Sequence, residues 1–99
     1  MAASNSPTLL ATEKTVASAG TAEALVASSQ RARSVTIIPK TSNTGQVYVG
    51  GSDVASTTND GLEPGDMITI PADGWLDLAD IYVDVDNNGE GVDFYAVKA

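Results

Sequence analysis

Short runs of β-branched and apolar residues, separated by turn-forming residues, are the feature that most limits how this chain can fold. Val, Ile, Tyr and Phe fit the half-buried surface of a pleated sheet, and short runs bounded by Gly, Pro, Asn and Asp are typical of antiparallel strands. The runs are Ser34–Ile38, Gln46–Gly50, Met67–Ile70, Asp80–Val85 and Gly91–Val97. They predict an all-β fold, namely a small antiparallel β-sandwich or barrel of jelly-roll-like form.

The residues between these runs carry specific turn signals. Pro64-Gly65 suits the two central positions of a type II turn, where glycine supplies the positive φ. Asn88-Gly89 lies within Asp84–Glu90 and predicts a hairpin between the last two strands. Around the second run, Asn43, Gly45, Gly50 and Gly51 are expected to serve backbone geometry rather than to bind a ligand.

Two prolines mark where strands are expected to stop. Pro39 and Pro71 each follow a β-branched run, and proline has no N–H to donate to a ladder. Residues 72–77, which include Trp75, are therefore predicted to form a loop.

Alternation along the last two runs predicts which side chains face the core. Residues two apart in a strand share one face of the sheet. The expected core positions are Ile81, Val83, Val85, Val92, Phe94 and Ala96. The opposite positions are Tyr82, Asp84, Asp93, Tyr95 and Val97, and this half-polar set predicts either ordinary surface or a second contact surface.

The N-terminal segment reads differently from the rest of the chain. Residues 1–20 are rich in Ala, Ser and Thr and lack a clear period, so they are predicted to form an extended N-terminal arm, either a flexible tail or a segment that orders on a neighbouring subunit. Residues 21–99 are predicted to form a single β domain. Thr21–Ser29 suits a short helix or a strand, and the β-rich sequence downstream favours a strand.

Composition excludes several classes of function. The net charge of −8 opposes nucleic-acid binding, which needs Lys and Arg to neutralise phosphates. The chain has no His and no Cys, so the usual zinc and copper ligands and a Cys or Ser–His nucleophile are missing. No apolar run is long enough to span a membrane and no signal peptide is evident, so we expect no membrane partner and no secretion.

The acidic turns offer only weak candidates for chemistry. Asp84–Gly89 matches the opening of an EF-hand loop, but the twelfth position is Tyr95 where a bidentate Glu is required. A looser calcium site within Asp84–Glu90 stays open as an alternative to a plain turn. Residues 64–73 resemble a strand-turn signature of cupins, whose metal-binding His residues have no counterpart here. We therefore expect no enzyme activity and no cofactor.

Ser42–Val54 resembles a segment found in small structural proteins of tailed bacteriophages. Companion segments of the same resemblance are Arg33–Ile37, Leu62–Asp66 and Asp80–Asp84. Among such proteins, the resemblance implies a capsid decoration (cement) protein, made in the host cytoplasm and located on the capsid surface of the virion. It also implies the major capsid protein as a partner and self-association as a homotrimer.

Two alternatives stay open beside this hypothesis. One is a structural module of a phage tail, fibre or baseplate. The other is a host-surface or carbohydrate-binding β-sandwich that uses Trp75 and Tyr82 as ring platforms. For any of these roles, the side chains expected to contact a partner are Leu9, Leu10, Arg31, Arg33, Trp75, Tyr82 and Tyr95.

Overall fold

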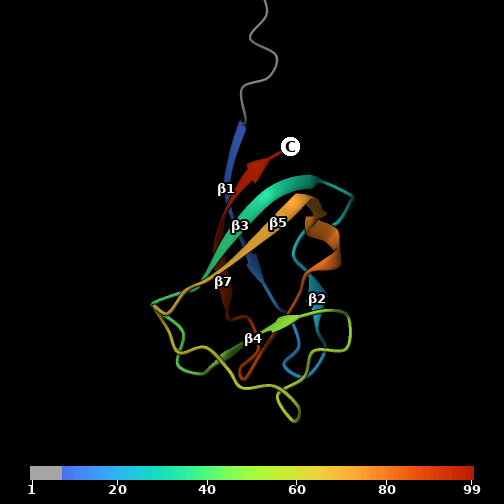
Figure 1. Cartoon of the computed structure of the whole chain (residues 1–99). Coiled ribbons are helices and arrows are strands. Elements are labelled where there is room, and N and C mark those ends of the chain that lie inside the picture. The colour runs from blue at the N-terminus through green and yellow to red at the C-terminus, as the bar shows by residue number, and fades with distance from the viewer. Residues whose placement is uncertain (1–7) are drawn as a thin grey trace, which may run out of the picture.

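Two antiparallel sheets pack face to face in the computed structural model, which describes residues 8–99 (Figure 1). The four-stranded sheet has the order β1-β7-β3-β5, and the three-stranded sheet has the order β2-β6-β4. The strands are β1 (Thr8–Thr15), β2 (Glu23–Ala24), β3 (Arg31–Pro39), β4 (Val47–Gly50), β5 (Ile68–Asp77), β6 (Tyr82–Val85) and β7 (Gly91–Lys98), with a 3-10 helix η1 (Leu78–Asp80) before β6. The predicted all-β sandwich is confirmed.

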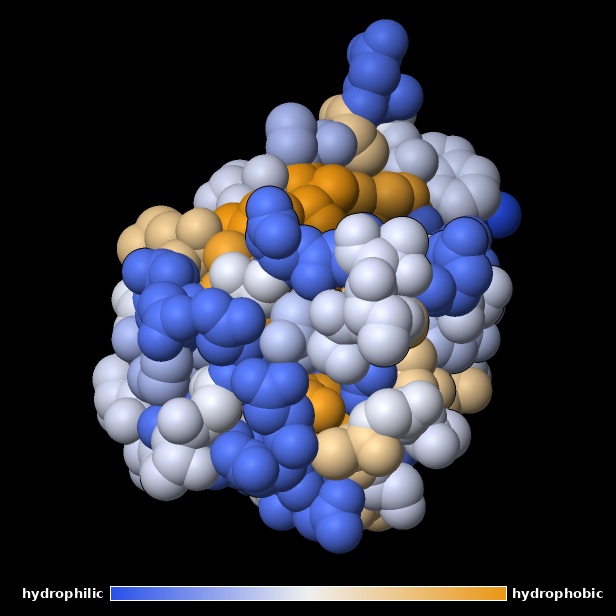
Figure 2. Space-filling view, turned by 90° about the horizontal axis from the view of Figure 1, so that it is seen from below, coloured by the Kyte–Doolittle hydropathy of each residue, from blue (hydrophilic) through white to orange (hydrophobic). Residues whose placement is uncertain are grey.

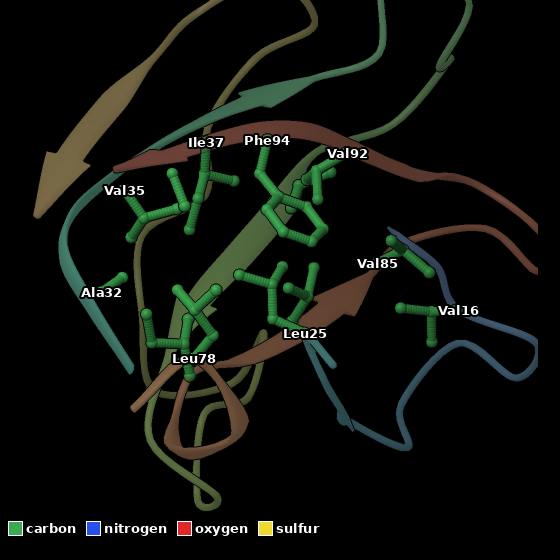
Figure 3. Close-up of a cluster of buried hydrophobic side chains, with 13 residues drawn as sticks. Val16, Leu25, Ala32, Val35, Ile37, Leu78, Val85, Val92 and Phe94 are labelled. Carbon is green, nitrogen blue, oxygen red and sulfur yellow. The ribbon is translucent and has the colours of Figure 1, made fainter. Parts of the chain in front are cut away.

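The core lies between the two sheets and consists mostly of aliphatic side chains. Phe94 is the largest fully buried side chain, and it points from β7 toward the three-stranded sheet among aliphatic neighbours (Figure 3). The core positions predicted from alternation, Ile81, Val83, Val85, Val92, Phe94 and Ala96, are all buried. Leu78 of η1 is also fully buried and belongs to the same cluster.

Asp84 does not follow the predicted pattern, because its side chain is only 1% exposed although it alternates with the core positions of β6. Its Oδ1 accepts hydrogen bonds from the N–H groups of Gly20 at 2.9 Å and Val85 at 2.8 Å. The segment before β2 therefore covers this side of β6. A buried carboxylate needs such donors, and sequence alternation alone does not reveal them.

The N-terminal segment is part of the four-stranded sheet from Thr8 onward. Strand β1 pairs antiparallel with β7 along its whole length, from Thr8 opposite Lys98 to Thr15 opposite Gly91. Residues 8–15 of the predicted arm are thus extended, but they pair with their own domain. Residues 1–7 of the predicted arm lie outside the described part of the chain.

The predicted hairpin at Asp84–Glu90 is wrong. Strand β6 belongs to the three-stranded sheet and β7 to the four-stranded one, so this turn crosses between the layers. A two-residue type I′ hairpin needs positive φ at both central residues, and no non-glycine residue among those described has positive φ. Gly89, with φ of 82°, provides a single left-handed residue.

The predicted loop at residues 72–77 is also wrong, because β5 continues through Pro71 to Asp77. Within the described part of the chain, strand β5 is the edge of its sheet and pairs with β3 alone, and an edge strand tolerates proline. Strand β2, in turn, is limited to Glu23–Ala24, shorter than the strand favoured for Thr21–Ser29.

The turn at Pro64-Gly65 agrees with its prediction. Gly65 has φ of 86°, and the N–H of Asp66 donates to the carbonyl of Glu63 at 3.0 Å, as a type II turn requires. None of Gly45, Gly50 and Gly51 has positive φ. For Gly45 the requirement is space, because a Cβ there would lie 2.6 Å from the Cβ of Asp86.

Neighbouring residues on β7 test this assignment of faces. Phe94→Ala removes a fully buried ring and should lower the free energy of unfolding by about 3–5 kcal/mol. Tyr95→Ala removes a half-exposed ring on the opposite face and should cost less than about 1 kcal/mol. Urea unfolding of both variants measures the difference. Equal losses for the two substitutions would contradict the assignment.

Candidate interaction surface

No segment of residues 8–99 covers the outer side of the four-stranded sheet, and the side chains there form rows across the strands. The register places Leu9, Val97, Ser34 and Pro71 in one row, and Ala11, Tyr95, Thr36 and Thr69 in the next. We call these eight residues the outer face. Leu9 is 77% exposed and Tyr95 is 52% exposed, which are high values for large apolar side chains on a regular sheet.

A side-chain hydrogen bond connects two strands on the outer face. The hydroxyl groups of Thr36 and Thr69 lie 3.0 Å apart and share a hydrogen bond across β3 and β5. An open hollow of about 390 Å³ is lined by residues of β1 and β7, namely Ala11, Thr12, Glu13, Asp93 and Tyr95. A regular sheet that presents apolar and hydroxyl side chains together suits contact with another macromolecule.

Three charged side chains, Glu13, Lys40 and Asp93, lie next to one end of the outer face. Lys40 Nζ lies 2.5 Å from Glu13 Oε1 and 2.8 Å from Asp93 Oδ1. The hydrogen bond to Asp93, followed by the one to Glu13, raises the pKa of Lys40 above its ordinary value. This lysine therefore stays charged and holds β1, β3 and β7 together at that end.

Arg31 and Trp75 meet at the other end of β3 and β5. The Arg31 guanidinium carbon lies 4.3 Å from the centroid of the Trp75 ring, within the range of a cation–π contact. Trp75 remains 52% exposed. The register between β3 and β5 shifts between Ala32 and Ser34. Arg33 lies at this shift and is exposed.

Five of the seven side chains predicted to contact a partner are exposed on the four-stranded sheet, and two are not. Leu9, Arg31, Arg33, Trp75 and Tyr95 all belong to strands of the four-stranded sheet and are exposed. Leu10 is partly buried and packs against the core. Tyr82 belongs to the three-stranded sheet and is half-buried. Aliphatic Val97 and hydroxyl-bearing Thr36 join the outer face, and only the strand register brings them there.

The acidic turns bind backbone groups of their own chain. Glu90 accepts hydrogen bonds from the N–H groups of Thr44 at 2.8 Å and Gly45 at 3.1 Å. Asp86 accepts one from the N–H of Gln46 at 2.9 Å and one from the hydroxyl of Tyr48 at 2.8 Å. These carboxylates thus tie the turn before β4 to the turn before β7. Within residues 8–99 no group of three or more acidic side chains is arranged to hold a metal ion.

The hydrogen bonds shift two pKa values in this cluster. The Thr44 N–H, and after it the Gly45 N–H and the Thr44 hydroxyl, lower the pKa of Glu90, and partial burial opposes this shift. The hydrogen bond to Asp86 raises the pKa of Tyr48. Both shifts follow from structural contacts, so they do not point to a catalytic acid or base.

The lower end of the molecule differs from the outer face. The loop of residues 51–66 lies there, and in the view from below hydrophilic and neutral side chains cover most of the surface, with apolar atoms gathered mainly in one strip (Figures 1 and 2). Among the described residues, no helix has the length and apolar character to cross a membrane. No protein family model matches the sequence, and comparisons with curated proteins and with solved structures found no significant match.

The hydrogen bonds of Glu90 predict a pH effect on stability. Because its pKa is lowered in the folded state, its contribution is present above the ordinary glutamate pKa of about 4.3 and is lost as the pH falls through the lower folded-state value. Glu90→Gln should therefore lower the unfolding temperature at pH 7, and the gap to the wild type should narrow toward pH 3.

Asp73→Asn is the matched control for this experiment, since Asp73 is exposed and accepts none of the side-chain hydrogen bonds found within residues 8–99. It should leave the unfolding temperature nearly unchanged at both pH values. Thermal unfolding followed by circular dichroism measures all three proteins. A gap between wild type and Glu90→Gln that stays constant from pH 7 to pH 3 would rule out this role for Glu90.

Proposed function

We propose that this protein is a capsid decoration (cement) protein that binds the outside of a phage head through the outer face of its four-stranded sheet. The observation that carries the proposal is the outer face itself, where Leu9 and Tyr95 are more than half exposed on a regular, well-supported sheet. Exposed apolar patches of this kind mark protein–protein contact sites. The resemblance of Ser42–Val54 to small structural proteins of tailed phages supports the choice of partner, the major capsid protein.

The charge distribution is compatible with attachment to a protein shell. The eight residues of the outer face carry no charge. Charged groups near its ends include the Glu13–Lys40–Asp93 cluster at one end and Arg31, which contacts Trp75, at the other. An uncharged centre with charged ends resembles the apolar core and polar rim of a protein interface. The net charge of −8 favours a protein partner over nucleic acid.

The structure gives less support to carbohydrate binding. Ring platforms for sugars need aromatic faces that are exposed together, whereas Trp75 and Tyr82 belong to different sheets. One face of the Trp75 ring is already covered by the Arg31 guanidinium at 4.3 Å. A structural module of a tail, fibre or baseplate would present the same outer face to another virion protein. The location of the protein on the phage particle therefore distinguishes such a module from a decoration protein.

Co-sedimentation with undecorated phage heads tests the proposal. The wild-type protein should sediment with the heads in a saturable manner, and Tyr95→Ala should weaken this binding by about tenfold or more, as expected for a central aromatic anchor. Tyr82→Ala is the matched control, because it removes the same side chain from the other sheet and should bind heads as the wild type does.

The possible results of the co-sedimentation experiment distinguish the two virion hypotheses. Binding of the wild type to purified tails but not to heads would replace decoration with the tail alternative. Binding to neither would overturn both. Equal binding by wild type and Tyr95→Ala would place the contact elsewhere on the molecule. Circular dichroism and unfolding of each variant confirm that the comparison is made between folded proteins.

A further inference from the structure

Strand β1 forms a long, regular and open sheet edge. It has eight residues and contains neither Pro nor Gly, and among residues 8–99 its only strand partner is β7. The edge of a sheet presents unpaired N–H and C=O groups that can pair with a strand of another chain, and proteins normally protect such edges.

The hydrogen-bond pattern shows which residues of β1 face the open edge. The Val16 N–H donates to the Glu90 carbonyl at 2.9 Å, at the point where β1 meets β7. Since bonding direction alternates along an antiparallel strand, the even-numbered residues of β1 bond to β7. Leu9, Ala11, Glu13 and Thr15 therefore direct their N–H and C=O groups away from the sheet.

The other three sheet edges are short or protected. On β5, the same alternation places Pro71 with its backbone nitrogen toward the open edge, where it has no N–H to offer. Strand β2 has only two residues. Strand β4 is covered in part by Leu62, whose N–H and carbonyl both bond to Val47, at 2.8 and 3.0 Å.

The two charges on β1 do not protect its edge. Charged side chains at an edge can oppose pairing, but Glu13 is held by Lys40 at 2.5 Å and Lys14 is held by Glu23 at 2.8 Å. Both contacts draw the side chains toward their own chain. The edge of β1 thus lacks every protective feature found at the other edges.

We propose that the edge of β1 binds the same edge of a second copy of this chain, antiparallel and with a two-fold axis at Thr12. The four outward-facing residues are spaced symmetrically about Thr12, so this register pairs all of their N–H and C=O groups at once. Leu9 of one copy lies opposite Thr15 of the other, and Ala11 lies opposite Glu13. Lys14 lies opposite Leu10, so no like charges are directly opposed.

In this dimer the outer face extends across both copies. Two four-stranded sheets joined through β1 make one continuous eight-stranded sheet, because β1 is the terminal strand of each. The rows that contain Leu9 and Ala11 then continue into the second copy. The inference does not depend on the proposed function. It also replaces the trimer implied by the resemblance with a dimer, because an edge that pairs with itself is closed after two copies.

Sedimentation velocity of the full chain over a concentration series tests the proposal. The wild type should reach twice the chain mass of 10.1 kDa. Ala11→Pro removes an outward N–H and leaves the bonds to β7 in place, so it should give a monomer, whereas Ala11→Val keeps the N–H and should dimerise as the wild type does. A wild type that stays monomeric up to about 1 mM, a trimer, or a dimer of folded Ala11→Pro would each overturn the proposal.

A second pair of variants covers the case in which Ala11→Pro does not fold. Thr12 is exposed, so Thr12→Lys does not disturb the core, and at the two-fold axis it places two ammonium groups opposite each other. Association should weaken by about tenfold or more at low salt and recover as salt screens the repulsion. Thr12→Gln is the uncharged control and should dimerise. Association of Thr12→Lys equal to that of Thr12→Gln at low salt would overturn the proposed axis.

Discussion

The register of β7 decides which side chains of the four-stranded sheet are buried and which are exposed. This strand pairs with β1 on one side and β3 on the other, and its alternate residues separate the core from the outer face. Phe94 is fully buried while Tyr95 is 52% exposed, so a slip by one residue would exchange them. The start of β7 fixes the register: a Cβ on Gly91 would lie 2.0 Å from the carbonyl oxygen of Lys14, and the side-chain amide of buried Asn43 donates to the Gly91 carbonyl at 2.8 Å.

The stretch from Thr41 to Val54 supports this register from the other layer. It enters β4 through Thr44 and Gly45, whose N–H groups bind Glu90 just before β7 begins. Asn43 reaches Gly91 in the same turn, so the two sheets are tied together where the chain crosses between them. The acidic residues Asp86 and Glu90 therefore hold the two sheets together through hydrogen bonds to backbone N–H groups.

Local sequence signals predicted the parts of the fold that depend on local chemistry. Alternation in residues 81–85 and 91–97 gave the buried positions, and Pro64-Gly65 gave its turn, because both depend on neighbouring residues. Three other features depend on partners far away in the sequence. They are the pairing of β1 with β7, the continuation of β5 through Pro71, and the burial of Asp84. The sequence predicts Leu9 and Tyr95 as contact residues, which stays a prediction. Only the register shows that Ala11 and Val97 lie beside them and that Tyr82 does not.

Strand β1 is an integral edge strand, bonded to β7 on one side and open on the other. Amide hydrogen exchange, measured by NMR at low protein concentration, reads out this arrangement residue by residue. Exchange should alternate along β1, slow for Leu10, Thr12 and Lys14 and fast for Leu9, Ala11 and Glu13. Uniformly fast exchange from Leu9 to Lys14 would show instead that β1 is not bonded to the sheet.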